Sequence, residues 1–112
     1  MARKEYLGEF EEIVLLVVAR LDDEAYGMRV RRELEASTGR AVSIGAVYAT
    51  LERLADKAFV RLGETPGTPG ERDGRARRFF RLTRAGAAAL ERAERNRAAA
   101  RAGLRMPRAR RS

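Results

Sequence analysis

The stretch that decides the fold is SIGAVYATLERLADKA, residues 43–58. It opens with a serine, a favoured helix N-cap, and continues with an apolar stripe at helical spacing. The stripe consists of Ile44, Val47, Leu51, Leu54 and Ala58. The opposite face starts with Gly45 and Ala49, small residues that folding does not require and that let this end approach another surface closely. The stretch therefore predicts a helix over residues 44–57 whose exposed start fits closely against a partner.

Two further helices are predicted ahead of this one. Residues 9–20 begin with glutamates, which suit the positive end of a helix dipole, and continue into the seven apolar residues 13–19. The β-branched residues in this run would also suit a buried strand, but its extension back to Phe10 favours a helix. A helix that is apolar on all sides needs cover on more than one side, which predicts a second subunit. Residues 25–38 form the next predicted helix, with Val30 and Leu34 facing inward and Gly39 as its stop signal.

A hairpin and one more helix are predicted after residue 58. Residues 59–63 and 77–82 suit two strands, and residues 65–74 between them include two prolines and three glycines, which is typical of a loop. Thr83 is the expected N-cap of an alanine-rich helix that ends near residue 103.

The charge is distributed unevenly along the 112 residues. The net charge is +8, but residues 1–25 carry −4 and residues 83–112 carry +7. This asymmetry predicts a face that binds a polyanion, with a merely solvated arginine-rich surface as the alternative. The chain has no cysteine and no histidine, which removes disulfides, the metal sites built on those residues and the usual nucleophile–base pairs. We therefore expect no cofactor, no metal and no enzymatic activity.

Nothing at the N-terminus resembles a signal peptide, because acidic residues follow the first basic pair. The longest apolar run has seven residues, far below the ~20 that a membrane helix needs. We expect a cytoplasmic protein with no membrane association.

Two helices, a turn, a third helix and a basic hairpin make up a winged helix-turn-helix. The predicted fold class is mainly α with a small β-hairpin. In this arrangement the third helix enters the major groove of DNA and the hairpin lies over the neighbouring phosphates. The predicted organisation is a DNA-binding domain over residues 1–82, a C-terminal dimerisation helix over 83–106 and a basic disordered tail over 107–112.

Three segments resemble the PadR family of transcriptional regulators. AYGMRV (25–30) resembles that family's AYGYEI segment, SIGAVYATLERL (43–54) its SPGSVYPALRRL recognition helix, and GRARRFFRLT (74–83) its GRPRKYYRLT wing strand. The resemblance covers about residues 10–90, with all three motifs in the family's order and spacing. This chain departs from the pattern at Met28, where the family has an aromatic residue, and at Ile44 and Ala49, where it has prolines. Such departures alter the set of DNA contacts rather than the fold.

The resemblance implies that helix 44–57 and the hairpin contact double-stranded DNA. The predicted DNA-binding residues are Ser43, Gly45, Tyr48, Ala49, Arg53, Arg75 and Arg77. Interpretations that do not involve DNA stay open for several of these residues. Tyr48 would also suit a half-buried packing position with its hydroxyl in water. Arg53 would also suit an ion pair with Glu52 or Asp56, and the hairpin arginines would also serve as solubilising charges.

The last predicted helix carries a stripe of small residues that would let another helix approach closely. The stripe consists of Gly86, Ala89, Ala93, Asn96, Ala100 and Gly103. An accidental pattern in so alanine-rich a helix is the alternative. In the resembled family, the C-terminal helix of one subunit packs against the N-terminal helix of the other. The predicted dimerisation residues are Ile13, Leu16, Val17, Leu90, Ala93 and Leu104.

These features predict a homodimeric, sequence-specific transcriptional regulator, a repressor that binds a palindromic operator, with room for an unknown small-molecule effector. The alternative function is a winged-helix protein that binds nucleic acid without sequence preference, because arginines that contact phosphates carry no sequence information. A third interpretation, a protein-interaction adaptor, fits the acidic first helix but leaves the basic hairpin unexplained.

Overall fold

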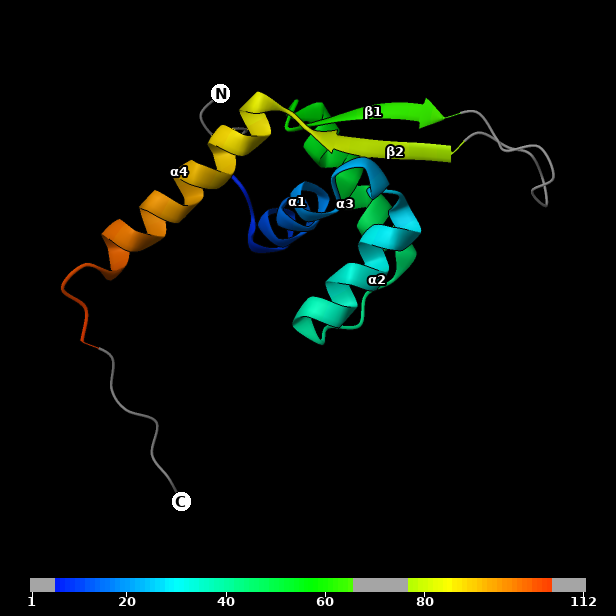
Figure 1. The fold of residues 1–112 in the computed structure, drawn as a ribbon. Helices are drawn as coiled ribbons and strands as arrows, with labels where there is room; N and C mark the ends of the chain where they lie inside the picture. The colour runs from blue at the N-terminus through cyan, green and yellow to red at the C-terminus, as the bar shows by residue number, and fades with distance from the viewer. Residues whose placement is uncertain (1–5, 66–76, 106–112) are drawn as a thin grey trace, which may run out of the picture.

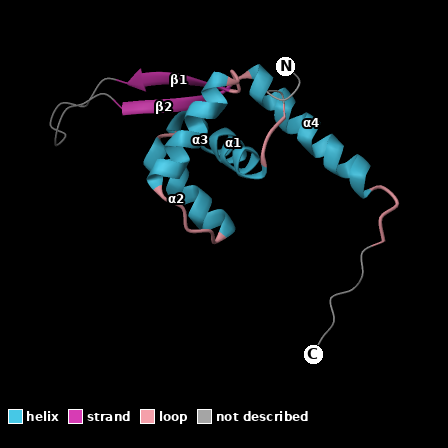
Figure 2. Cartoon of the chain, turned by 180° about the vertical axis from the view of Figure 1, so that it is seen from behind, coloured by secondary structure: helices cyan, strands magenta, loops and turns pink. Residues whose placement is uncertain are grey.

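The computed structural model of the protein describes residues 6–65 and 77–105. The elements follow one another as α1 (Glu9–Leu21), the 3-10 turn η2 (Asp22–Glu24), α2 (Gly27–Thr38), α3 (Ile44–Asp56), β1 (Val60–Thr65), β2 (Arg77–Leu82) and α4 (Arg84–Arg101). The first three helices form a body, from which the hairpin and α4 extend in opposite directions (Figures 1 and 2). The predicted fold class, mainly helical with a small hairpin, is confirmed.

The core lies where the three helices of the body meet the hairpin. Each helix contributes residues spaced three or four apart, as a helix with one buried face requires. The largest fully buried hydrophobic side chains are Phe80, Leu15, Leu34, Leu51, Leu54, Val14, Val18, Val30 and Val47. Burying each of them contributes about 1.5–3 kcal/mol relative to leaving it in water. The inward orientation predicted for Val30 and Leu34 is confirmed.

The hairpin is an antiparallel pair whose register runs from Val60 opposite Leu82 to Thr65 opposite Arg77. The short segment between η2 and α2 lies along the other edge of β2. There the Phe80 N–H donates to the Ala25 carbonyl over 3.0 Å, and Tyr26 bridges to Phe79. This pairing explains why α2 begins at Gly27 rather than at residue 25 as expected: the two residues before it are extended and belong to the sheet.

Helix α1 is covered largely within one protomer. Val14, Leu15, Val17 and Val18 are all buried, because α2, α3, β2 and α4 each contact this helix. Leu16 remains half exposed, at 50%. The expectation that one protomer could not cover an all-apolar helix is therefore wrong for most of its length. Packing from several sides supplies the cover.

Ala58 does not continue the apolar stripe of α3 as predicted. It is exposed and has a positive φ of 65°, because it follows the end of the helix in the left-handed conformation. The Phe59 N–H donates to the Leu54 carbonyl and the Ala58 N–H to the Ala55 carbonyl, both over 2.9 Å. This is the Schellman pattern of a helix end, in which the left-handed position normally holds glycine.

Ala58→Gly is expected to stabilise the protein by about 0.5–1 kcal/mol. The substitution removes the cost of a left-handed alanine, less the extra freedom that glycine has in the unfolded chain. Gly39→Ala is the reciprocal control, since Gly39 has φ 70° and an added Cβ there would meet no atom within 4 Å. It should lower the melting temperature, and thermal unfolding of both variants measures the pair. Equal melting temperatures for Ala58→Gly and the parent protein would contradict this account.

Candidate nucleic-acid interface

The exposed start of α3 is small, uncharged and capped. Ser43 has the extended backbone of an N-cap, and its Oγ accepts a hydrogen bond from the Ala46 N–H over 3.0 Å, as predicted. Gly45, Ala46 and Ala49 follow with exposed side chains or none. Their small size leaves the backbone within reach of an approaching surface, and the positive end of the helix dipole points toward that surface.

Tyr48 lies at the edge of this face and packs onto α2. A Cβ on Gly27 would overlap the Tyr48 ring, so the glycine at the start of α2 is what lets the two helices approach here. Tyr48 is half-buried against the core, and no described residue forms a hydrogen bond with its hydroxyl. The packing interpretation of the ring is confirmed, and the hydroxyl is left for solvent or a ligand.

Arg53 does not join the other predicted residues of α3. Its Nη2 donates to Thr50 Oγ1 over 3.0 Å, and its Nε lies 3.4 Å from Glu11 Oε2, on the side of α3 that faces α1. The alternative pairing with Glu52 or Asp56 is wrong, because the acid beside Arg53 comes from another helix. Local sequence patterns could not reveal this partner, because Glu11 lies far from Arg53 along the chain.

Glu11 belongs to a cluster of charged side chains between α1 and the end of α3. Its Oε1 accepts hydrogen bonds from Lys57 Nζ and from the Gly8 N–H, both over 2.8 Å. Burial alone would raise the pKa of the Glu11 carboxyl. The hydrogen bonds and charge of Lys57, with the Gly8 N–H and Arg53, outweigh burial and lower this pKa below its ordinary value of 4.5.

Glu11→Gln is expected to destabilise the protein by about 2 kcal/mol at neutral pH, because it removes hydrogen bonds to a buried charge. A folded-state pKa below the unfolded one stabilises the fold above pH 4.5, and the contribution is lost as the pH falls through the lower folded-state pKa. The difference in melting temperature between the variant and the parent should therefore shrink below pH 4.5. Glu9→Gln is the control, since its pair with Arg40 is exposed and should contribute little at any pH. A pH-independent difference for Glu11→Gln would contradict the assignment.

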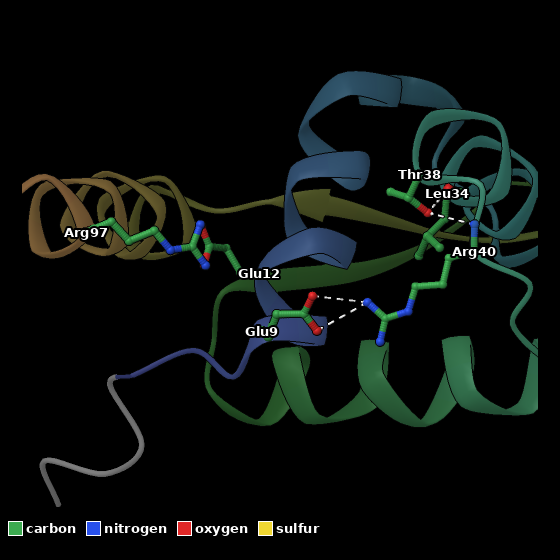
Figure 3. A network of polar contacts seen from close by, with 6 residues as sticks. All are labelled: Glu9, Glu12, Leu34, Thr38, Arg40 and Arg97. Atoms are coloured by element: carbon green, nitrogen blue, oxygen red, sulfur yellow. Dashed lines mark hydrogen bonds and ion pairs between the residues drawn. The ribbon is translucent and has the colours of Figure 1, made fainter. Parts of the chain in front are cut away.

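The other glutamates at the start of α1 bind one arginine from the segment between α2 and α3 and one from α4 (Figure 3). Both Glu9 carboxylate oxygens accept hydrogen bonds from Arg40, whose guanidinium also lies over the Phe10 ring, 5.1 Å from its centroid. Glu12 is buried and accepts a hydrogen bond from Arg97 of α4 over 2.6 Å. The first turn of α1 thus contacts both the segment that leads into α3, through an exposed ion pair, and α4, through a buried carboxylate.

The hairpin arginines fall partly outside the described residues. Arg75 lies outside them, and Arg77 is the first residue of β2. Of the described hairpin arginines, Arg81 pairs with Asp23 over 2.7 Å. Arg78 lies beside a hollow of about 800 Å³ between α2, α3 and β2. The hollow is lined by Glu24, Tyr26, Gly27, Met28, Arg29, Arg32, Tyr48 and Arg78.

Sequence reasoning missed Arg29, Arg32 and Arg78 as candidate binding residues. The first two lie on α2 with exposed side chains, away from the core. Their convergence with Arg78 requires the turn between α2 and α3 and the docking of β2. Within the sequence, the only local signal was the density of arginine in RARRFFR, residues 75–81.

The predicted dimerisation residues occupy different environments in the protomer. Leu16 and Leu104 are exposed, at 50% and 56%. Ile13, Leu90 and Ala93 are half-buried, whereas Val17 is only 5% exposed and has little surface left for a partner. From residue 94 to the end of α4, every residue is exposed. The second half of α4 therefore has no cover within the described part of the protomer.

Over residues 6–65 and 77–105, no group of three acidic side chains is placed to hold a metal ion. Within the same ranges, no helix combines the length and apolar character that a membrane crossing requires.

Helix α2, the turn and α3, followed by a hairpin that packs on the same body, define a winged-helix protein. The family model described as the transcriptional regulator PadR-like family matches residues 14–92. The chain therefore belongs to the PadR-like family of transcriptional regulators, which are not enzymes. No curated protein matches it.

Several solved structures share the fold. A PadR-like transcription factor from Bacteroides fragilis is 21% identical, with a TM-score of 0.73 over 92% of this chain and 90% of that one. A PadR family transcription regulator from Clostridium difficile is 17% identical, with a TM-score of 0.65 over 85% and 93%. The Bacillus subtilis PadR in complex with operator DNA is 13% identical, with a TM-score of 0.61 over 92% of this chain but 51% of its own.

Proposed function

We propose that this regulator binds a specific palindromic DNA sequence as a homodimer and represses transcription from it. The observation that carries the proposal is the exposed start of α3, where Ser43, Gly45 and Ala49 leave the helix free to enter a major groove. The similar Bacillus subtilis protein was solved in complex with operator DNA, which supports the same kind of partner here. A DNA partner also favours the cytoplasm as the place of action.

Different elements make different kinds of contact with the DNA. The start of α3 reads base edges, and Tyr48 offers its hydroxyl at the edge of the same face. The hairpin arginines, Arg75 and Arg77 among them, bind phosphates and fix the register of α3 in the groove. Arg53 is the least favoured of the proposed residues, because Glu11 already balances part of its charge.

A homodimer is supported by the uncovered second half of α4 and by exposed Leu16 and Leu104. Ile13, Leu90 and Ala93 keep partial exposure on α1 and α4 and extend the proposed interface. A two-fold dimer presents two copies of α3, which favours an operator with two inverted half-sites about one helical turn apart. Repression then follows from occupancy of a promoter, and an effector that changes the angle of α4 would alter the half-site spacing.

Selection of bound duplexes from a random pool tests this function. We expect the recovered sequences to converge on one inverted repeat. Recovery of unrelated sequences would favour the second candidate, a winged-helix protein without sequence preference. That candidate is supported by the +7 charge of residues 83–112, which would hold any nucleic acid at low salt.

A further inference from the structure

The hollow between α2, α3 and β2 concentrates positive charge. Arg29 and Arg32 come from successive turns of α2, and Arg78 comes from β2. Among the described residues that line the hollow, Glu24 is the only acidic one, and it pairs with Arg29 over 3.2 Å. Within the described part of the chain, Arg32 and Arg78 have no ion pair and no hydrogen bond. Two uncompensated guanidinium groups therefore face one opening.

The floor of the hollow is apolar and fixed. The Tyr48 ring lies on Gly27, where no larger residue would fit, and the Tyr26 ring meets Phe79 edge to face with centroids 6.3 Å apart. The arginines thus surround a rigid floor rather than a mobile surface. A planar guanidinium forms two parallel hydrogen bonds with a phosphate, so two or three of them converging on one opening suit a phosphate group.

Tyr48 connects the hollow with the proposed DNA-reading face, since its ring forms part of the floor and its edge borders the exposed start of α3. When α3 lies in a major groove, we expect the backbone that borders the groove to pass over α2 and toward the loop end of β2, where Arg78 lies. A phosphodiester is therefore the anion that this opening would meet first.

We propose that this hollow is a binding site for one phosphodiester of the DNA backbone in each half-site, with Arg32 and Arg78 as its principal ligands. Arg29 contributes less because its charge is already balanced by Glu24. The proposal rests on the proposed function. A free phosphate ion would offer the same oxygen acceptors, and the experiment below distinguishes it from a phosphodiester of the DNA backbone.

Arg32→Ala and Arg78→Ala should each weaken binding about tenfold, and by the same factor for the selected duplex and for a scrambled one, because a phosphate contact carries no sequence information. Each should also reduce the dependence of log affinity on log salt by about one unit. Glu24→Gln should act in the opposite direction, since it releases Arg29. Arg84→Ala is the matched control: it removes one exposed charge from the start of α4, away from the hollow, and should change little.

Duplexes that carry one neutral methylphosphonate at successive backbone positions identify the ligand. We expect one position per half-site at which the neutral linkage weakens the parent protein but no longer weakens the Arg32→Ala, Arg78→Ala double variant. If the double variant binds as Arg84→Ala does, the site is overturned, while the proposed function stands provided that the parent still prefers the selected duplex. If instead inorganic phosphate binds the parent but not the double variant, and no methylphosphonate position shows the coupling, the hollow is a site for a free anion and the backbone assignment is wrong.

Discussion

Ala49→Glu is expected to lower the affinity for the selected duplex about 100-fold and to leave the melting temperature nearly unchanged. Ala49 is exposed on the outward face of α3, so a longer side chain meets no protein atom that must move. A carboxylate at this position would face DNA phosphates and would hold the helix away from the base edges. The combined loss corresponds to about 3 kcal/mol of binding free energy.

Ala85→Glu is the matched control for this variant. It makes the same change on an exposed position of another helix, in the first turn of α4, outside the proposed DNA-binding residues. Fluorescence anisotropy titrations at one salt concentration compare the two. If both variants lose affinity equally, the effect is one of net charge, and α3 is not the element that enters the groove.

Gly86→Ala should have the largest effect on the fold, a loss of about 3 kcal/mol and roughly 12 °C in melting temperature. A Cβ at this position would overlap the backbone carbonyl of Phe59 and lie 2.8 Å from a methyl group of Leu82. The start of α4 would have to move away from the hairpin. That movement would break the hydrogen bond from Thr83 Oγ1 to the Ala58 carbonyl, which is 2.6 Å long.

Gly45→Ala is the control, because the two substitutions are chemically identical and both lie in helices. At Gly45 the nearest atom to an added Cβ is Ser43 Oγ at 3.9 Å, so the variant should gain about 0.5–1 kcal/mol from the higher helix propensity of alanine. Calorimetry gives both values, and light scattering at micromolar concentration shows whether displacement of α4 also separates the proposed dimer. A Gly86→Ala variant as stable as the parent would show that α4 is not seated on the hairpin as described.

Local signals in the sequence predicted the parts of the fold that local physics decides. Ser43 and Thr83 were expected as N-caps, and each side chain accepts the hydrogen bond from the N–H three residues later. The returning strand at residues 77–82 was predicted with the bounds that it has. In each case the residue types within one turn or one strand are sufficient to favour the structure.

Contacts between distant segments escaped that reasoning. Val17 was assigned to a dimer interface because its helix is apolar all round, but tertiary packing buries it within one protomer. Arg53 pairs with Glu11, 42 residues away in the sequence, rather than with its helical neighbours. The hollow formed by α2, α3 and β2 could not be predicted, because no periodicity in one segment specifies which side chains of another segment will face it.

The central claim is that the exposed start of α3 gives this protein a preference for one DNA sequence. The most direct measurement is the ratio of dissociation constants for a scrambled duplex and the selected duplex, at about 0.15 M salt. The account predicts a ratio of at least about 1000, with the selected duplex bound by two protomers. A ratio near one, with both affinities falling in parallel as salt is raised, would contradict it and would identify an electrostatic binder of nucleic acid.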